Sequence, residues 1–342
     1  MRGVMMYGPG DVRVEERDMP RIVETTDAVI RLTATCICGS DLWPYRGAEP
    51  LHSTPQAMGH EYIGVVEEIG ADVENVKVGD FVVGSFVASD NACEICQAGY
   101  QSRCVHNVMM GEIGTQAEYA RIPLADGTLV TTPGQPHPDL IPSLMAASDV
   151  LGTGWYGAVA AEAGPGKTIA VVGDGAVGLS AVLAAKQLGA ERIIMFSRHP
   201  ERQALARAFG ATDIVEERGR EAGERIRELL GGVLADSVVE AVGTKESMEQ
   251  AIASVRPGGH LGYVGVPAGG AELPIGVLFA KNISVAGGMA PARAYIPELL
   301  VDVLSGAIDP GRVFDLELPL TEAAEAYAAM DERRAIKVLL RP

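Results

Sequence analysis

The sequence of 342 residues contains only 5% aromatic side chains and five cysteines, and no run of about 18 apolar residues. The last absence argues against a membrane-spanning helix. The N-terminal segment, MRGVMMYGPGDVRVEE, lacks the apolar core of a secretory signal and is charged within its first turns. Basic residues are also scarce: 28 stand against 45 acidic ones. The net charge of −17 argues against nucleic acid or an anionic membrane as a partner.

The five cysteines lie in two short segments, Cys36 with Cys38, and Cys93 with Cys96 and Cys104. A disulfide framework would spread its cysteines along the chain. In a chain with no recognisable leader, this clustering therefore favours metal binding. Metal-binding thiols persist in a reducing compartment, and we therefore expect a cytoplasmic protein.

The length and the changing texture of the sequence predict two domains. The first 125 residues or so contain short β segments, for example 27–33, 62–69 and 80–83, and few helical periods. From about residue 141 strand-like and helix-like segments alternate. They are strands 168–172, 192–196, 213–215, 236–240 and 260–264, and helices 179–188, 201–209, 220–230 and 245–255.

This alternation predicts an α/β domain with a parallel, doubly wound sheet. After about residue 288 the pattern becomes irregular, and the chain ends on a strand-like segment, AIKVLLRP. The simplest architecture is a β-rich domain, residues 1–148 and 289–342, into which a doubly wound domain, residues 149–288, is inserted.

A glycine signature, G-D-G-A-V-G at residues 173–178, follows one of the buried-strand patterns and opens a helix. Gly173 would make the turn, Gly175 would let the backbone approach a pyrophosphate, and Gly178 would allow close helix packing. The amides around Ala176 and Val177 would lie at the helix N-terminus, where an anion is favoured. The alternative is a glycine-rich turn without a ligand, but the strand–helix context favours dinucleotide binding.

The second strand of this domain ends in Ser197-Arg198-His199. An NAD-specific site has an acid there for the ribose hydroxyls. Without that acid, Arg198 can pair with a 2′-phosphate, and we therefore predict NADP(H). Arg198 as a solvated surface charge is the alternative, and Arg202 on the following helix either assists or faces solvent.

The second cysteine segment has the spacing of a structural zinc site that lacks one thiolate. Cys93-x2-Cys96 with Cys104 supplies three sulfur ligands. Three residues before Cys93 stands Asp90, a carboxylate that can complete a tetrahedral set. His106 is the competing fourth ligand, and a metal-free loop is the other alternative.

The first cysteine segment, Cys38-Gly39-Ser40-Asp41, is followed about twenty residues later by Gly59-His60-Glu61. A thiol, an imidazole and a carboxylate are the ligands of a catalytic zinc that keeps one position open. A lone histidine is more often a packed residue, but the two motifs together favour a ligand. Cys36 alternates to the other face of a strand and is expected to be buried.

Taken in order, C-G-S-D (38–41), G-H-E (59–61), the cysteine segment (90–104), A-A-S-D-V-L-G-T-G (146–154) and G-x-G-x-x-G (173–178) have the spacing of a known family. Over essentially its full length the chain resembles the zinc-dependent medium-chain alcohol dehydrogenases. The resemblance implies a GroES-like β domain that holds the zinc ions, with a Rossmann domain inserted and the active site in the cleft between them.

The resemblance also implies roles for particular residues. Cys38 and His60 would bind the catalytic zinc, and Glu61 would be a ligand that can bind or release. Asp149 would be the last protein ligand, whereas the sequence alone favours a helix N-terminal acid at this position. Ser40 would relay the substrate proton.

Further implied roles lie outside the direct ligands. Asp41 would hold His60 in one tautomer, and an acid at the first position of the structural zinc segment supports Asp90. Val242 and Gly243 would line the nicotinamide, and Lys337 would reach the cofactor phosphates.

One position departs from the family. Many relatives have a histidine five residues after the zinc cysteine, where this chain has Trp43, and an indole cannot pass a proton to solvent. The relay therefore ends at Ser40 and the cofactor ribose, or a water or His52 completes it. Trp43 can instead form a wall of the substrate pocket.

The implied reaction is hydride transfer between NADP(H) and an alcohol, ketone or aldehyde, with zinc acidifying the alcohol or polarising the carbonyl. Two alternatives remain: a zinc-free quinone or enoyl reductase of the same superfamily, and a non-catalytic NADPH-binding protein. The expected partners are a small-molecule substrate and further copies of the chain, because relatives are dimers or tetramers.

Overall fold

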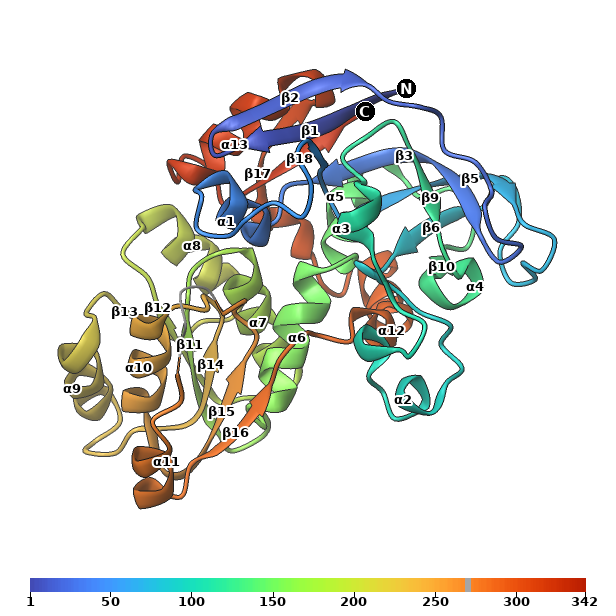
Figure 1. Ribbon diagram of the computed structural model, residues 1–342. Coiled ribbons are helices and arrows are strands. Elements are labelled where there is room, and N and C mark those ends of the chain that lie inside the picture. The colour runs from blue at the N-terminus through green and yellow to red at the C-terminus, as the bar shows by residue number, and fades with distance from the viewer. Residues whose placement is uncertain (268–271) are drawn as a thin grey trace. The chain divides into compact units, whose positions relative to one another are not determined.

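The computed structural model describes residues 1–267 and 272–342, which divide into two compact units (Figure 1). The first unit contains Met1–Gly152 and Pro291–Pro342, and the second contains Thr153–Ala290. The sequence placed these boundaries at residues 149 and 288. No helix of the described residues is long and apolar enough to cross a membrane.

The first unit is rich in short strands. Its main sheet has the order β10-β6-β5-β3-β18-β17, with β9 also on β3, and a smaller sheet has the order β2-β1-β4. The strands are β1 (Arg2–Gly8), β2 (Asp11–Glu16), β3 (Ala28–Cys36), β4 (Gln56–Ala57), β5 (Tyr62–Ile69), β6 (Phe81–Gly84), β7 (Val87–Ala88), β8 (Val108–Met109), β9 (Tyr119–Ile122), β10 (Leu129–Thr131), β17 (Phe314–Pro319) and β18 (Lys337–Arg341).

The C-terminal strand β18 returns to the centre of this sheet. It pairs antiparallel with β3, with Leu339 opposite Cys36. Strand β3 is buried along most of its length because β5, β9 and β18 surround it. The return of the tail to the first unit therefore brings together residues 300 positions apart, as the contact between Lys337 and Ile37 shows.

Short helices connect the strands of the first unit, and longer ones pack against its sheets. They are α1 (Leu42–Tyr45), α2 (Glu94–Gln97), α3 (Met110–Ile113), α4 (Ala125–Thr128), α5 (Ile141–Ala147), α12 (Ala292–Leu304) and α13 (Ala323–Asp331), while α6 (Val150–Ala160) crosses the boundary between the units.

The second unit is a parallel sheet of order β13-β12-β11-β14-β15-β16. Its elements are β11 (Thr168–Val172), β12 (Arg192–Phe196), β13 (Asp213–Val215), β14 (Ala235–Glu240), β15 (Val255–Tyr263), β16 (Ser284–Gly287), α7 (Ala176–Gln187), α8 (Pro200–Phe209), α9 (Gly219–Leu229), α10 (Lys245–Ser254) and α11 (Ile275–Lys281). Each neighbouring pair runs parallel. The predicted doubly wound sheet is confirmed, and strands β11, β12 and β13 have the predicted bounds.

The predicted strand at the end of the chain is confirmed as β18, but the irregular pattern after residue 288 did not reveal two helices. Helices α12 and α13 occupy part of this segment. Helix α13 has the sequence AAEAYAAMD, and three of its five buried residues are alanines, which carry little hydrophobic period. Helix α12 contains Pro297, which a sequence pattern treats as a helix breaker.

Candidate functional site

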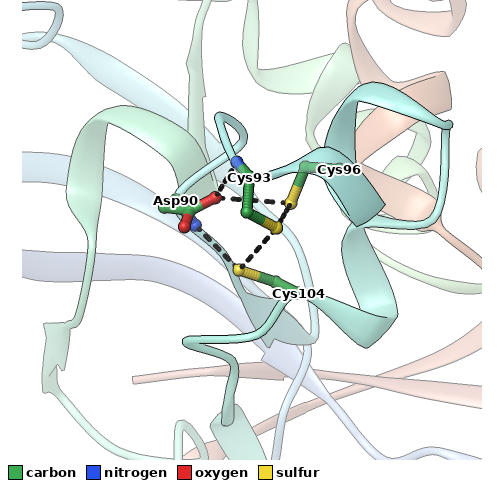
Figure 2. A group of neighbouring side chains, drawn as sticks. All are labelled: Asp90, Cys93, Cys96 and Cys104. Carbon is green, nitrogen blue, oxygen red and sulfur yellow. Dashed lines mark hydrogen bonds between the residues drawn. The ribbon is translucent and has the colours of Figure 1, made fainter.

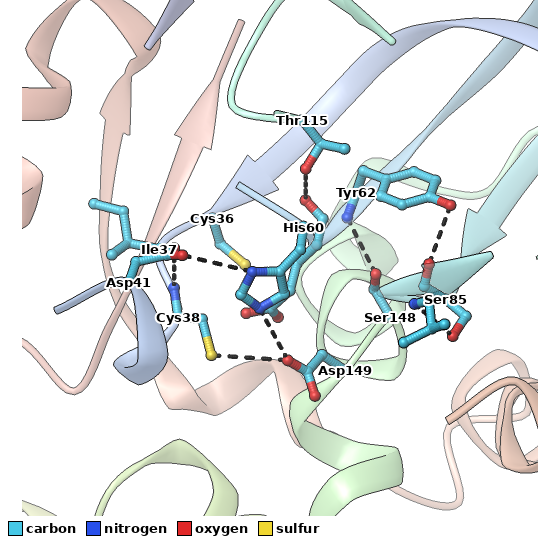
Figure 3. A network of polar contacts seen from close by, with 12 residues as sticks. Cys36, Ile37, Cys38, Asp41, His60, Tyr62, Ser85, Thr115, Ser148 and Asp149 are labelled. Atoms are coloured by element: carbon cyan, nitrogen blue, oxygen red, sulfur yellow. Dashed lines mark hydrogen bonds and ion pairs between the residues drawn. The ribbon is translucent and has the colours of Figure 1, made fainter. Parts of the chain in front are cut away.

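Four predicted ligands from three distant segments come together in the first unit (Figure 3). Cys38 follows β3, His60 and Glu61 precede β5, and Asp149 lies between α5 and α6. One ligand atom from each lies within 4.8 Å of the others. The Asp149 Oδ2 atom is 3.3 Å from His60 Nε2 and 3.7 Å from Cys38 Sγ. Asp149 therefore fits both of its predicted roles, because it immediately precedes helix α6 and also faces the other three ligands.

Buried hydrogen bonds hold the ligand-bearing segments together. Ser148 accepts the backbone N–H of Tyr62 at 3.1 Å and donates to the carbonyl of Gly84 at 2.6 Å, which fixes the turn before Asp149 against β5 and β6. The carbonyl of Glu61 accepts the hydroxyl of Thr35 at 2.8 Å. The ligands are thus positioned by the ends of strands and by their cross-links rather than by a mobile loop.

A glycine is required beside the histidine. Gly59 has φ +97°, and a Cβ there would lie 2.5 Å from the backbone nitrogen of Gln116. Any side chain would therefore displace His60 from its present position. On the other side of the imidazole, Asp41 Oδ1 is 3.5 Å from Nδ1, so that Nε2 is the nitrogen turned toward Asp149.

Burial and neighbouring charge perturb the ligands. Burial and the nearby Asp149 carboxylate raise the pKa of the Cys38 thiol. Burial alone would lower the pKa of His60, but Asp41 and Asp149 raise it well above its usual range. Without a metal, this cluster therefore retains protons that a divalent cation would displace.

The structure corrects the role expected for Lys337. Its side chain is 1% exposed, and its Nζ donates to Glu61 Oε1 at 2.7 Å and to the carbonyl of Ile37 at 3.1 Å. This ammonium is committed to the metal cluster within the first unit, so it is not available as the predicted phosphate contact. Burial raises the pKa of Glu61, and Lys337 opposes that rise.

The residues present fit a catalytic zinc. Glu61 Oε2 is buried and has no hydrogen-bond partner among the described residues, although Oε1 is satisfied by Lys337. A thiolate, an imidazole and a carboxylate, with a second carboxylate oxygen left unpaired, form the donor set of a tetrahedral zinc site. Cys36, which is 1% exposed, belongs to neither metal cluster, as expected.

The predicted proton relay is only partly present around the cluster. Ser40 lies in the short 3-10 turn of residues Gly39–Asp41, next to Cys38, and is half-buried. Trp43 belongs to α1, where the guanidinium of Arg46 lies 5.9 Å from its ring centroid. His52 is exposed, and its backbone N–H donates to Gln56.

A second cluster contains the other predicted ligands, Asp90, Cys93, Cys96 and Cys104 (Figure 2). The sulfur of Cys93 is 3.5 Å from that of Cys96 and 3.9 Å from that of Cys104. Asp90 Oδ1 lies 3.4 Å from Cys96 Sγ, so the carboxylate completes the group. His106 is 68% exposed and contacts Asp90 Oδ2 at 2.7 Å, which places it outside the cluster as a support for its carboxylate.

The glycine signature adopts the predicted geometry in the second unit. Gly173 has φ +111° at the end of β11. A Cβ on Gly178 would lie 1.7 Å from the Gly173 carbonyl oxygen, so only glycine allows α7 to pack there. Gly175, which precedes Ala176 at the start of α7, has open space where a Cβ would project. An open, glycine-lined helix N-terminus fits a dinucleotide pyrophosphate.

Sequence reasoning missed an acid beside the ribose position. Asp174, inside the glycine signature, accepts the hydroxyl of Ser197 at 2.7 Å and pairs with Arg202 at 3.3 Å. Arg198 is exposed, and its Nε donates to the carbonyl of Glu216. The signal is the acid at a variable position of the signature, because this loop lies against the end of the second strand, β12.

A further missed residue is Glu240, at the end of β14. Its carboxylate is 1% exposed and accepts the backbone N–H groups of Val242 and Gly243, both at 2.8 Å. The two residues predicted to line the nicotinamide are therefore held in one conformation by a buried acid. No periodicity indicates such a contact, since it depends on a turn that folds back onto its own strand.

Comparisons with known proteins agree with this geometry. The family model for the alcohol dehydrogenase GroES-like domain matches residues 24–133, and the model for zinc-binding dehydrogenase matches residues 176–305. The chain is 35% identical to zinc-type alcohol dehydrogenase B of Aspergillus flavus, over 100% of this chain and 81% of that protein. It is 36% identical to a protein of Mycobacterium tuberculosis named probable zinc-binding alcohol dehydrogenase, over 100% of this chain and 89% of that protein.

Among solved structures, the alcohol dehydrogenase TADH from Thermus sp. ATN1 is similar with a TM-score of 0.90 and 33% identity, covering 100% of this chain and 99% of that one. The two family models match parts of both units, and the relatives cover the whole chain. The chain belongs to the zinc-dependent medium-chain dehydrogenase family.

Proposed function

We propose that this oxidoreductase is a zinc-dependent alcohol dehydrogenase or carbonyl reductase that transfers a hydride between NADP(H) and an alcohol, ketone or aldehyde. The observation that carries the proposal is the cluster of Cys38, His60, Glu61 and Asp149, in one chain with an open glycine-lined helix N-terminus. A zinc ion held by these residues would supply Lewis acidity toward the substrate oxygen. The second cluster would hold a structural zinc ion.

The side chains around the cluster have separate tasks in this proposal. Cys38, His60 and Asp149 hold the metal. Asp41 keeps the imidazole oriented from its Nδ1 side. Ser40, adjacent to Asp41, would accept the proton that an alcohol loses. Beyond Ser40, the half-buried Trp43 cannot continue the relay, so water or the cofactor ribose would complete it.

The preference for NADP(H) rests on the end of β12. Among the described residues no acid pairs with Arg198, whose guanidinium is exposed and can form a charge-assisted contact with a 2′-phosphate. Asp174 is the opposing consideration, because a carboxylate repels phosphate. Its contacts with Ser197 and Arg202 offset that charge.

One experiment tests the chemistry. Oxidation of NADPH would be followed with a panel of ketones, aldehydes and quinones, with zinc content measured in parallel. We expect turnover of a ketone or aldehyde and loss of both turnover and one zinc ion in the Cys38→Ser variant. Turnover of quinones by zinc-free protein would indicate the quinone reductase alternative, and tight NADPH binding without any turnover would indicate a non-catalytic protein.

A second experiment tests the nucleotide. The Arg198→Ala variant should raise KM for NADPH at least about tenfold, the loss of one charge-assisted contact, and leave KM for NADH unchanged. Arg207→Ala is the control, because Arg207 is an exposed arginine on the following helix α8 and donates to the carbonyl of Thr212. Equal changes for both nucleotides would contradict the NADP(H) assignment.

We further propose a cytoplasmic location, a small-molecule substrate, no nucleic acid or membrane partner, and a homo-oligomer. The five free cysteines support a reducing compartment, and the net charge of −17 supports the absence of nucleic acid. Light scattering on the purified protein would test the oligomer.

A further inference from the structure

We propose that Gln116 and Tyr327 are positioning residues for the catalytic metal, acting through Asp41 on the imidazole of His60. The inference rests on the proposed zinc site. It adds a buried chain of hydrogen bonds that begins on α13, near the C-terminus, and ends at a metal ligand. Neither residue belongs to the sequence motifs of the site.

The carboxylate of Asp41 divides its two oxygens between different tasks. Oδ2 accepts the backbone N–H of Cys38 at 3.0 Å and an N–H of the Gln116 side chain at 3.1 Å. Oδ1 faces His60 Nδ1 at 3.5 Å. Because Oδ2 is fully engaged, the carboxylate plane is fixed, and Oδ1 is directed at the imidazole rather than free to rotate.

The Gln116 amide is held in one orientation. Its Nε2 also donates to the carbonyl of Cys36 at 3.0 Å, and its Oε1 accepts the hydroxyl of Tyr327 at 3.0 Å. A flipped amide would point its carbonyl oxygen at the Cys36 carbonyl and the Asp41 carboxylate. Both contacts would then be repulsive, so the amide orientation, and with it that of Asp41, is determined by its partners.

The backbone of Gln116 is locked against the histidine segment as well. Its N–H donates to Met58 at 2.8 Å, and its carbonyl accepts the N–H of Val4 at 2.8 Å. The missing Cβ of Gly59 provides the space that the Gln116 backbone nitrogen and Cγ occupy. Gln116 and Tyr327 are both 0% exposed, so no water competes for these hydrogen bonds from outside.

This arrangement requires an amide. Gln116→Glu would place a carboxylate against Asp41 Oδ2 and a carbonyl, whereas Gln116→Met keeps the volume and removes both donors. Tyr327→Phe keeps the ring, which packs 5.3 Å from that of Tyr45, and removes only the hydroxyl. The three variants therefore grade the damage to the chain of hydrogen bonds without opening a large cavity.

The test is zinc release to an excess of chelator, followed in the full-length protein without substrate. The phase that disappears in Cys38→Ser reports the catalytic cluster. We expect this phase to be about 10–100-fold faster in Gln116→Glu and Gln116→Met, the range for partners that orient metal ligands, and about fivefold faster in Tyr327→Phe. The visible d–d bands of cobalt at this cluster should shift in the same order.

The control is Gln250→Met in the second unit, where a buried glutamine accepts the N–H of Gly219. It makes the same chemical change and should leave zinc release and the cobalt bands unchanged, although it lowers Tm. Wild-type release rates and cobalt bands in folded Gln116→Met would overturn the proposal. If that variant does not fold, unchanged values in Tyr327→Phe overturn it.

The outcome is separate from that of the proposed function. Zinc that leaves faster from the Gln116 variants of a protein that turns over no carbonyl would support the positioning role while contradicting the dehydrogenase. Absence of the Cys38-dependent phase from the wild-type protein would contradict both.

Discussion

The two metal clusters of the first unit contain a carboxylate and cysteine each, but they are built in opposite ways. The cluster of Asp90, Cys93, Cys96 and Cys104 lies within one short segment, and Asp90 accepts the N–H groups of neighbouring Ala92 and Cys93. The cluster around Cys38 joins residues up to 111 positions apart and depends on side chains from β18 and α13. Local backbone organises the first cluster, and tertiary structure organises the second.

The pKa shifts of the two carboxylates, Asp90 and Glu61, differ in direction. At the local cluster, burial alone would raise the pKa of Asp90, but backbone N–H groups and His106 lower it well below its usual value. At the distant cluster, burial raises the pKa of Glu61 despite the ammonium of Lys337. Asp90 is ionised and has its hydrogen bonds made by neighbouring groups, which suits a permanent ligand of a structural metal. Glu61 is buried with one oxygen unpaired, which suits a ligand that binds the metal and releases it again.

The largest contrast between the clusters should come from Lys337→Met. Removing the ammonium leaves the Glu61 carboxylate buried without its partner, which costs about 3–5 kcal/mol of unfolding free energy. We expect this loss in urea denaturation, together with loss of zinc from the Cys38 cluster and retention at the Asp90 cluster. The double variant Lys337→Met/Glu61→Gln should recover most of the stability, and a single variant as stable as the parent would contradict the contrast.

The next largest difference in stability should come from alanine substitutions at two matched glycines, one beside each cluster. Gly59 and Gly99 both have positive φ, +97° and +90°, and each lies beside a metal cluster. Alanine at either position costs about 1–2 kcal/mol through its backbone conformation. Only at Gly59 does the added Cβ meet backbone, at 2.5 Å from Gln116, which adds about 1–3 kcal/mol.

The measurement is the free energy of unfolding of Gly59→Ala and Gly99→Ala, with zinc content of each. We expect Gly59→Ala to lose the catalytic zinc as well, because its displaced backbone carries His60. Equal destabilisation by the two substitutions would show that packing against Gln116 contributes nothing.

The smallest expected effect is the pH dependence of stability at the Asp90 cluster. The pKa of Asp90 is lowered in the folded protein, so its contribution to stability is present above the ordinary aspartate pKa of about 3.9 and is lost as pH falls below it. In zinc-depleted protein, Asp90→Asn should therefore cost about 1–2 kcal/mol at neutral pH, and this cost should shrink progressively as pH falls from about 4 to 2. Thermal unfolding from pH 2 to 7 would measure this, and a difference independent of pH would contradict it.

Sequence patterns predicted some parts of this molecule well. Strands β11, β12 and β13 have the predicted bounds because short apolar runs that alternate with helix-like segments are typical of buried parallel strands. The alanine-rich α13 was missed because alanine gives no hydrophobic period, although its burial is complete at several positions. Among site residues, Cys38 and His60 stood in short motifs, whereas Gln116 and Tyr327 belong to no motif.

Short-range chemistry was thus determined by the sequence itself: the ligand types at fixed spacing, the glycine signature, the alternation that makes a parallel sheet, and the family. Tertiary structure decided which charges meet. It paired Lys337 with Glu61 rather than with a phosphate, brought Asp174 beside Ser197, and joined Tyr327 to Asp41 through Gln116. The reason is physical: a motif records the groups that one segment offers, but burial and pairing depend on which distant segment the fold places against it.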